Sequence, residues 1–259
     1  MARVHQATAL LTGIAAILAS STSADQARTF VGYAFDLTTG EALYTETHEE
    51  IVGADGGGEL RTIYTTPEGD TIAVRTVDFS VDPLAPVFHF EDMRTGYREG
   101  ALRVDDEVVL YRTPPRKTTV EQAVTEPSRQ LVVDAGFDRL VATNWDSLVA
   151  GEPLVADFAV PSRLTCLTIR VDKKEDGILD GEPVVTFRMR FKNPLLRLVA
   201  GPIDVTYHRA ERFLMRYEGL SNVSDPRGNN HTVRIDFPIA ERRSLAPVEI
   251  AEWRAANNG

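Results

Sequence analysis

The chain has 259 residues, of which 43% are hydrophobic and 25% charged, a composition typical of a globular protein that is long enough to bury a core. Its formal charge of −10 argues against a surface that binds nucleic acid. Its single cysteine excludes an intramolecular disulfide and any cysteine-rich zinc or iron–sulfur site.

The first residues follow the three-part pattern of a secretory signal. One arginine precedes a short apolar run from Ala7 to Ala19, and small residues follow up to Ala24. The apolar run is too short to span a membrane, so we predict a signal peptide over residues 1–24 and not a transmembrane protein. An uncleaved anchor or a buried N-terminal helix is the alternative. Export with one cysteine predicts a periplasmic protein, with residues 25–259 as a single domain.

From Asp25 onward, hydrophobic and polar residues alternate in short segments that end at Gly, Pro or Asp turns. Alternation with a period of two predicts β-strands, and the tight turns predict an antiparallel meander. In the first half the predicted strands cover residues 31–37, 42–50, 60–66, 71–80, 87–93, 97–104 and 107–112. In the second half they cover residues 154–160, 163–171, 183–191, 202–208, 212–218 and 231–237.

One helix is predicted between the two sets of strands, over about residues 134–150. Asp134 is its predicted N-cap, and Gly151 is its predicted end. Five apolar side chains recur at the spacing that forms one stripe of a helix: Phe137, Leu140, Val141, Trp145 and Leu148.

These elements predict a mainly β protein. A long antiparallel sheet must curl to bury its apolar face, and the single helix is the candidate to cover it. We therefore predict a meander curled into a half-open barrel, with one central helix packed on its concave face. A β-sandwich is the alternative closure.

Two stretches resemble stretches of uncharacterised Gram-negative periplasmic proteins: Tyr33–Glu46 (YAFDLTTGEALYTE) and Asp134–Arg139 (DAGFDR). The export signal, the meander and the inserted helix together resemble the half-barrel of periplasmic lipoprotein carriers of the LolA/LolB type. This resemblance implies binding of a lipid or acyl chain. It supplies no motif from which site residues can be carried over.

A ligand-binding site is predicted on the concave face beside the helix. Its ligand is a lipid, an acyl chain or another hydrophobic small molecule, unless this apolar face is only a filled core. Six large apolar side chains mark the predicted site: Phe137, Trp145, Phe187, Met189, Phe213 and Met215.

Charge is unevenly distributed along the chain. Residues 25–112 hold 7 basic and 18 acidic side chains, whereas residues 113–259 hold 20 of each. In the second half, five arginines lie on the polar faces of predicted strands and form a stripe where those strands are neighbours: Arg188, Arg190, Arg212, Arg216 and Arg234. The first four of these are the predicted anion-binding residues. Such a stripe is a candidate site for an anionic head group or a partner. The alternative is a solvated outer face whose arginines pair with nearby carboxylates.

Glu46 and His48 are the candidate catalytic residues, on one face of the second predicted strand together with Glu50. A carboxylate beside an imidazole can orient a general base. His89 and Glu91 repeat this arrangement on another strand, and adjacency of the two strands would create a candidate metal site. Polar alternation on an exposed strand face accounts for both pairs without a function.

The sequence contains no nucleophile elbow, P-loop or dinucleotide-binding motif, so no cofactor and no bound metal are predicted. The favoured function is an exported protein that binds a lipid or another hydrophobic ligand. One alternative is an envelope interaction or structural protein with a protein partner and no small ligand. A second is a hydrolase-like or metal-dependent enzyme that uses Glu46, His48 and His89.

Overall fold

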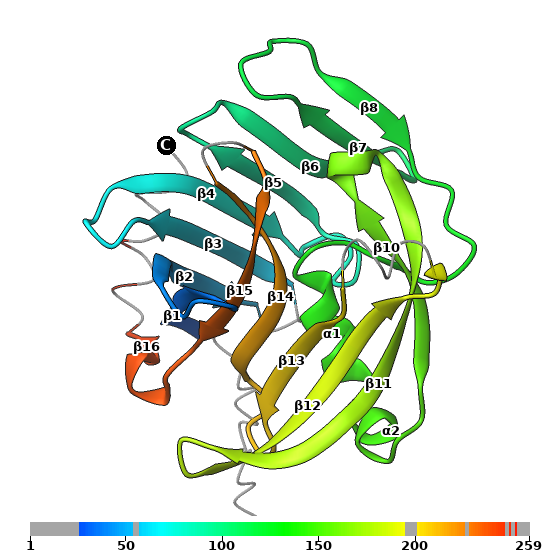
Figure 1. Cartoon of the computed structure of the whole chain (residues 1–259). Coiled ribbons are helices and arrows are strands. Elements are labelled where there is room, and N and C mark those ends of the chain that lie inside the picture. Colours follow the sequence, from blue (N-terminus) through cyan, green and yellow to red (C-terminus); the bar gives the residue numbers. More distant parts are fainter. Residues whose placement is uncertain are drawn as a thin grey trace, which may run out of the picture.

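The chain forms one continuous, strongly curved β-sheet. The computed structural model describes residues 26–53, 57–194, 201–225, 228–246, 249 and 252, and the predicted signal peptide lies outside these ranges. Within the described ranges there are sixteen strands, and every neighbouring pair is antiparallel except β9 with β10. Figure 1 shows the sheet curling around an interior that contains α1.

The first half of the chain supplies eight strands in simple hairpin succession: β1 (Gln26–Asp36), β2 (Ala42–Val52), β3 (Gly58–Thr65), β4 (Thr71–Asp78), β5 (Val87–Asp92), β6 (Tyr97–Val104), β7 (Glu107–Thr113) and β8 (Glu121–Val124). The second half supplies the others: β9 (Leu131–Val132), β10 (Leu154–Val160), β11 (Thr165–Leu179), β12 (Glu182–Phe191), β13 (Ile203–His208), β14 (Leu214–Ser224), β15 (Asn230–Asp236) and β16 (Arg243–Leu245). The two halves join where β1 pairs with β15, and β16 pairs with the other end of β1.

The sheet curls without closing. Its path runs from β8 through β1 and β15 to β9, and the two terminal strands do not pair with each other. Instead, the 3₁₀ turn η1 (Pro161–Arg163) after β10 lies against β6 and β7. There Arg112 donates a hydrogen bond to the carbonyl oxygen of Ser162. The part of the chain after β10 therefore lies against β6 and β7 without pairing with them. β8 remains as one edge of the sheet.

Two short helices occupy the region where one helix was predicted. α1 (Gly136–Thr143) and α2 (Trp145–Val149) are separated at Asn144, whose backbone φ and ψ of −106° and 19° are not helical. The first helix begins after Ala135, and Asp134 does not cap it: its backbone is left-handed, with φ +45°, and its carboxylate binds Arg75. The apolar stripe still faces inward, because Leu140, Val141, Trp145 and Leu148 are buried.

Local sequence explains how the chain turns. The hairpin between β11 and β12 uses Asp180 and Gly181, both with positive φ, which suits the right-handed twist of the two strands. The start of α1 requires Gly136 for a different reason. A Cβ at this position would lie 2.1 Å from the carbonyl oxygen of Leu84, so only glycine lets the helix start approach the loop before β5.

The core consists of two main clusters that flank the interior. The larger one lies under the first-half strands and β15, around Tyr64, Phe88 and Phe90. The other lies between the helices and β10–β13, where the ring of Trp145 meets Phe187 edge to face at 5.6 Å. Each cluster covers part of the concave face, and neither fills the space between them.

The predicted fold class is confirmed: the structure is a mainly β, half-open barrel with a helix on its concave face. A sandwich is not formed, because all sixteen described strands belong to one sheet. Neither described α-helix exceeds eight residues, and in the described ranges no helix has the length and apolar character needed to cross a membrane.

Candidate functional site

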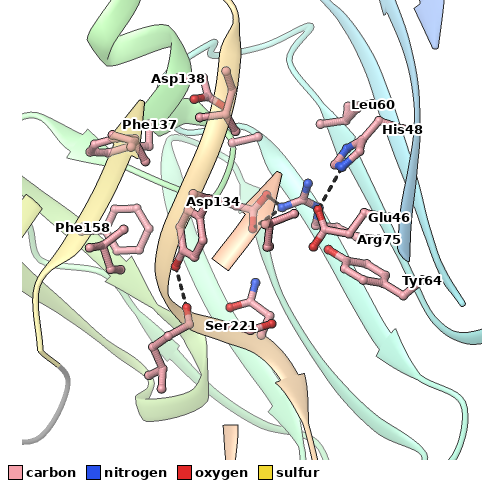
Figure 2. A pocket seen from close by; sticks show the side chains of 18 of the residues that line it. Glu46, His48, Leu60, Tyr64, Arg75, Asp134, Phe137, Asp138, Phe158 and Ser221 are labelled. Atoms are coloured by element: carbon pink, nitrogen blue, oxygen red, sulfur yellow. Dashed lines mark hydrogen bonds and ion pairs between the residues drawn. The ribbon is translucent and has the colours of Figure 1, made fainter. Parts of the chain in front are cut away.

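A cavity of about 710 Å³ lies between α1 and the concave face of the sheet, and it is partly open to solvent. Its two sides differ in chemistry. Figure 2 shows Glu46, His48 and Arg75 on one side and the rings of Phe137 and Phe158 on the other. Strands of the first half supply most of the polar wall, and strands of the second half together with α1 supply most of the apolar wall.

The polar wall contains a continuous chain of hydrogen bonds. Arg75 Nη2 donates to Thr62 Oγ1 at 3.2 Å, and Thr62 Oγ1 lies 3.1 Å from His48 Nδ1. On the other side of the imidazole, Nε2 lies 3.0 Å from Glu46 Oε2. If Thr62 donates to Nδ1 and Nε2–H donates to Glu46, every group in the chain is satisfied, so we assign the Nε2–H tautomer to His48.

His48 is largely buried, although it lines the cavity. Its ring stacks on Phe30 at 4.4 Å with an interplanar angle of 3°, and the ring of Phe237 meets it edge-on at 5.6 Å. Both ring nitrogens have protein partners, Thr62 on one side and Glu46 on the other. Glu46 and His48 therefore belong to a largely buried polar network that reaches the wall of the cavity.

The chain of hydrogen bonds ends at an ion pair between Arg75 and Asp134. Arg75 Nη1 lies 3.1 Å from Asp134 Oδ1, and both side chains are largely buried, with 15% and 6% of their surface exposed. Burial disfavours the charged guanidinium, but Asp134 and then Tyr64 more than compensate, and the pKa of Arg75 is raised. Arg75 therefore stays charged inside the protein.

Two further polar contacts connect α1 to opposite sides of the sheet. Arg139 donates to Glu50 Oε1 on β2 at 3.1 Å, and the same carboxylate binds Arg28 Nη2 at 2.6 Å. On the opposite side, the hydroxyl of Tyr207 on β13 donates to Asp138 Oδ1 at 2.5 Å. Asp138 faces the cavity and keeps an accessible surface there. Desolvation by the surrounding protein raises its pKa despite the bond from Tyr207.

A buried carboxyl without a cationic partner lies at the β6 side of the cavity. Glu99 is 7% exposed, and among the described residues it forms no ion pair. The hydroxyl of Tyr97 donates to Glu99 Oε2 at 2.8 Å. Burial raises the pKa of Glu99 to about 7, against the opposing effect of the Tyr97 bond. Glu99 is therefore close to half protonated at neutral pH.

The apolar wall consists of large inward-facing side chains that are only half-buried. Side chains at inward positions of a filled core would be fully buried, so the surface that these residues keep is the surface of the cavity. They are Phe137, Phe158, Leu167, Phe191, Ile203 and Leu214.

The six predicted ligand-binding residues fall into two groups. Phe137, Met189 and Phe213 line the cavity. Trp145, Phe187 and Met215 are buried in the surrounding core, with 5%, 0% and 2% exposure, and do not line it. Three of the six predicted residues thus lie at the surface of the cavity, and the other three lie in the core around it.

The four predicted anion-binding arginines do not share one surface. Arg212 lines the cavity, beside the ring of Trp145. The other three lie outside it, each in an ion pair formed by strand register: Arg188 with Asp204 at 2.6 Å, Arg190 with Asp172 at 2.8 Å and Arg216 with Asp236 at 2.6 Å. These pairs correspond to the solvated outer face that was the alternative interpretation of the arginine stripe.

The candidate metal site that combined His48 with His89 is not assembled. β3 and β4 lie between the strands that carry the two histidines, and His89 faces outward beside Glu91 and Tyr111. The strand pairing that this site required does not occur. Across the described ranges, no group of three or more His, Cys, Asp and Glu side chains is arranged to hold a metal ion.

Several charged residues that line the cavity were not among the predicted site residues. Glu99 lies in phase with Tyr97 and Ala101, and Asp92 lies in phase with Phe88 and Phe90. A charged residue in phase with apolar neighbours on a strand faces inward, and this signal was available in the sequence. Arg242 gives no such signal, because it lies between two short elements, η2 (Ile239–Glu241) and β16.

Comparison with known proteins supports the fold. No protein family model and no curated protein sequence matches this chain. A solved structure does match it: the beta-barrel-like protein of domain of unknown function DUF1849 from Brucella abortus, with 10% sequence identity and a TM-score of 0.50, over 86% of this chain and 98% of that one. At this identity the similarity shows a shared barrel-like fold and nothing more specific.

The Arg75–Asp134 pair yields a direct prediction for stability. Asp134→Asn removes the partner of a buried cation but keeps a side chain that tolerates positive φ, so we expect a loss of about 3 kcal/mol in the free energy of unfolding. Urea denaturation measures it. The control is Asp236→Asn on the outer face, where the partially exposed arginine partners predict a loss below about 1 kcal/mol. Equal losses in the two variants would contradict the account.

Glu99 yields a pH-dependent prediction. The folded pKa of about 7 lies above the ordinary value of 4.5, so between these values the unfolded chain loses its proton first, and stability falls as pH rises. Glu99→Gln removes this penalty. We expect it to raise the free energy of unfolding by roughly 2 kcal/mol more at pH 8 than at pH 5. Denaturant titrations at both pH values test this, with Glu107→Gln on the exposed surface as control; a gain independent of pH would refute it.

Proposed function

We propose that this protein is an exported, periplasmic binding protein that holds a lipid, an acyl chain or another hydrophobic ligand inside its curved sheet. The observation that carries the proposal is the cavity of about 710 Å³ with half-buried aromatic and aliphatic side chains along one wall. Cavities of roughly 300–1,000 Å³ that combine apolar walls with a few polar groups are typical ligand sites.

The energetics of the apolar wall favour an apolar ligand. Each methylene group that moves from water to such a surface contributes about 0.8 kcal/mol. A chain of ten methylenes therefore gains roughly 8 kcal/mol, from which the loss of freedom on binding must be subtracted. The binding free energy that remains is sufficient for a protein that binds its ligand reversibly, as a carrier or a sensor does.

The architecture and the sequence support the proposal in different ways. The barrel-like fold is compatible with a curved sheet that encloses a ligand, and the meander with its inserted helix resembles the LolA/LolB lipoprotein carriers. The periplasmic location is supported by the signal-like pattern of residues 1–24 and by the single cysteine.

The polar network at Glu46 and His48 gives the enzyme alternative less support. His48 has both nitrogens engaged and lies between two aromatic rings, and His89 is on the outer face. Binding requires only the cavity, whereas catalysis would also require a substrate to reach an imidazole that is only 4% exposed.

A cavity-filling substitution tests the proposal. Leu167 lines the apolar wall and is half-buried, so Leu167→Trp places an indole in the space that the ligand would occupy. We expect the wild-type protein to bind the neutral apolar dye N-phenyl-1-naphthylamine, measured by its fluorescence, and the variant to bind it at least about tenfold more weakly.

The matched control is Leu102→Trp, at an outer position of β6 that is 45% exposed. It should bind the dye like the wild type, and unfolding free energies should show that both variants are folded. Equal binding by the two variants would locate the dye outside the cavity, and absence of binding to the wild type would overturn the proposed function.

A further inference from the structure

The side chain of Arg242 is a cation without a counter-ion at the wall of the cavity. Its guanidinium carbon lies 4.1 Å from the ring centroid of Phe213 and 4.7 Å from that of Phe30, so it is held between two aromatic rings. Its Nη2 donates to the carbonyl oxygen of Leu214 at 2.5 Å, and its buried Nε has no hydrogen-bond partner. Among the described residues, no carboxylate forms an ion pair with it.

A second arginine lies close to Arg242. Arg28 lies two residues before Phe30 on the same face of β1, and it also lines the cavity. Arg28 and Arg139 share the single carboxylate of Glu50. Glu50 and Asp138 also act on Arg242, but among the described residues neither carboxylate forms an ion pair with it. Burial and the field of Arg28 lower the pKa of Arg242 to about 10, so it remains a cation at neutral pH.

This arrangement differs from the other arginines discussed above. Arg188, Arg190 and Arg216 each have a carboxylate within 2.8 Å. A desolvated cation costs free energy unless an anion and further hydrogen bonds compensate it. Within the described residues the protein supplies no such anion to Arg242, and the cavity is the space from which one can approach.

The position of Arg242 also defines the kind of anion. The rings of Phe213 and Phe30 that hold the guanidinium line the cavity themselves, and Leu214 begins the apolar wall next to it. A bound molecule that reaches Arg242 with a charged oxygen therefore leaves its remaining part against apolar side chains. Guanidinium groups pair best with planar or tetrahedral oxyanions.

We propose that Arg242, assisted by Arg28, binds the oxyanion head group of an acidic amphiphile, a carboxylate or a phosphate, whose apolar chain lies along the wall formed by Phe137, Phe158 and Leu167. This inference rests on the proposed function and deepens it, because it names the chemical class of the ligand. The charged end lies against β1 and the segment before β16, and the chain extends toward α1 and β10–β11.

Head-group selectivity tests the inference without any variant. Decanoic acid, decyl phosphate and decanol carry the same chain and are compared at pH 8 by displacement of N-phenyl-1-naphthylamine. At least one of the two anions should bind roughly tenfold or more tightly than decanol, because charge-assisted hydrogen bonds are the stronger ones. The two anions also distinguish a fatty-acid carboxylate from a lipid phosphate as the source of the head group.

Arg242→Gln should bring the affinity of the favoured anion down to that of decanol while decanol itself binds as before. The matched control is Arg234→Gln on the outer face, where the arginine also lies over an aromatic ring, at 5.1 Å from the centroid of Phe35, but is paired with Asp236. This control should keep the preference for the anion. Arg242→Lys retains the charge and should retain part of the preference.

The two proposals fail in different ways. If decanol and both anions displace the dye equally from the wild type, the head-group inference is wrong and the proposed function stands. If neither the dye nor any of the three chains binds, both are wrong. If Arg242→Gln is folded and still prefers the anion, Arg242 is not the head-group site.

Discussion

The position of α1 inside the sheet depends on three polar contacts, and the cavity depends on that position. Asp134 binds Arg75 on β4, Arg139 binds Glu50 on β2, and Asp138 accepts a hydrogen bond from Tyr207 on β13. These contacts reach both sides of the concave face, so they hold the helix across the opening of the sheet. The apolar side chains of the helices pack against β10–β13. The polar contacts to Arg75 and Glu50 connect α1 and the residue before it to the strands of the first half.

The two halves of the chain supply different walls of the cavity. The acidic first half supplies the wall that contains Glu46, Glu50 and Glu99, and the second half supplies the apolar wall. One wall of the cavity is therefore polar and the opposite wall is apolar. Most of its buried charges have partners within the protein, whereas Arg242 has none among the described residues. The fold thus combines a surface for an apolar chain with a largely buried arginine that has no ion-pair partner in the described part of the chain, and an acidic amphiphile complements both.

The strands were predictable because period-two alternation requires only one buried face. The three strands that were missed, β8, β9 and β16, are four residues or fewer, too short to show a pattern. The face that carries Glu46 and His48 was also identified, but alternation does not reveal whether a polar face meets solvent or a cavity. The outer arginines were ambiguous for a related reason: their partners are set by strand register, as with Arg188 and Asp204. Arg242 lies in irregular chain, where position follows from tertiary contacts alone.

The central claim is that the cavity holds an acidic amphiphile in the protein as it exists in its own cells. Native mass spectrometry of the protein purified from those cells, followed by organic extraction, tests this claim most directly. We expect a population with an adduct of a few hundred daltons that is recovered as a fatty acid or a single-chain lipid phosphate, of the size that a cavity of about 710 Å³ admits. Only the bare chain, with an empty extract and no uptake of added decanoic acid or decyl phosphate, would contradict it.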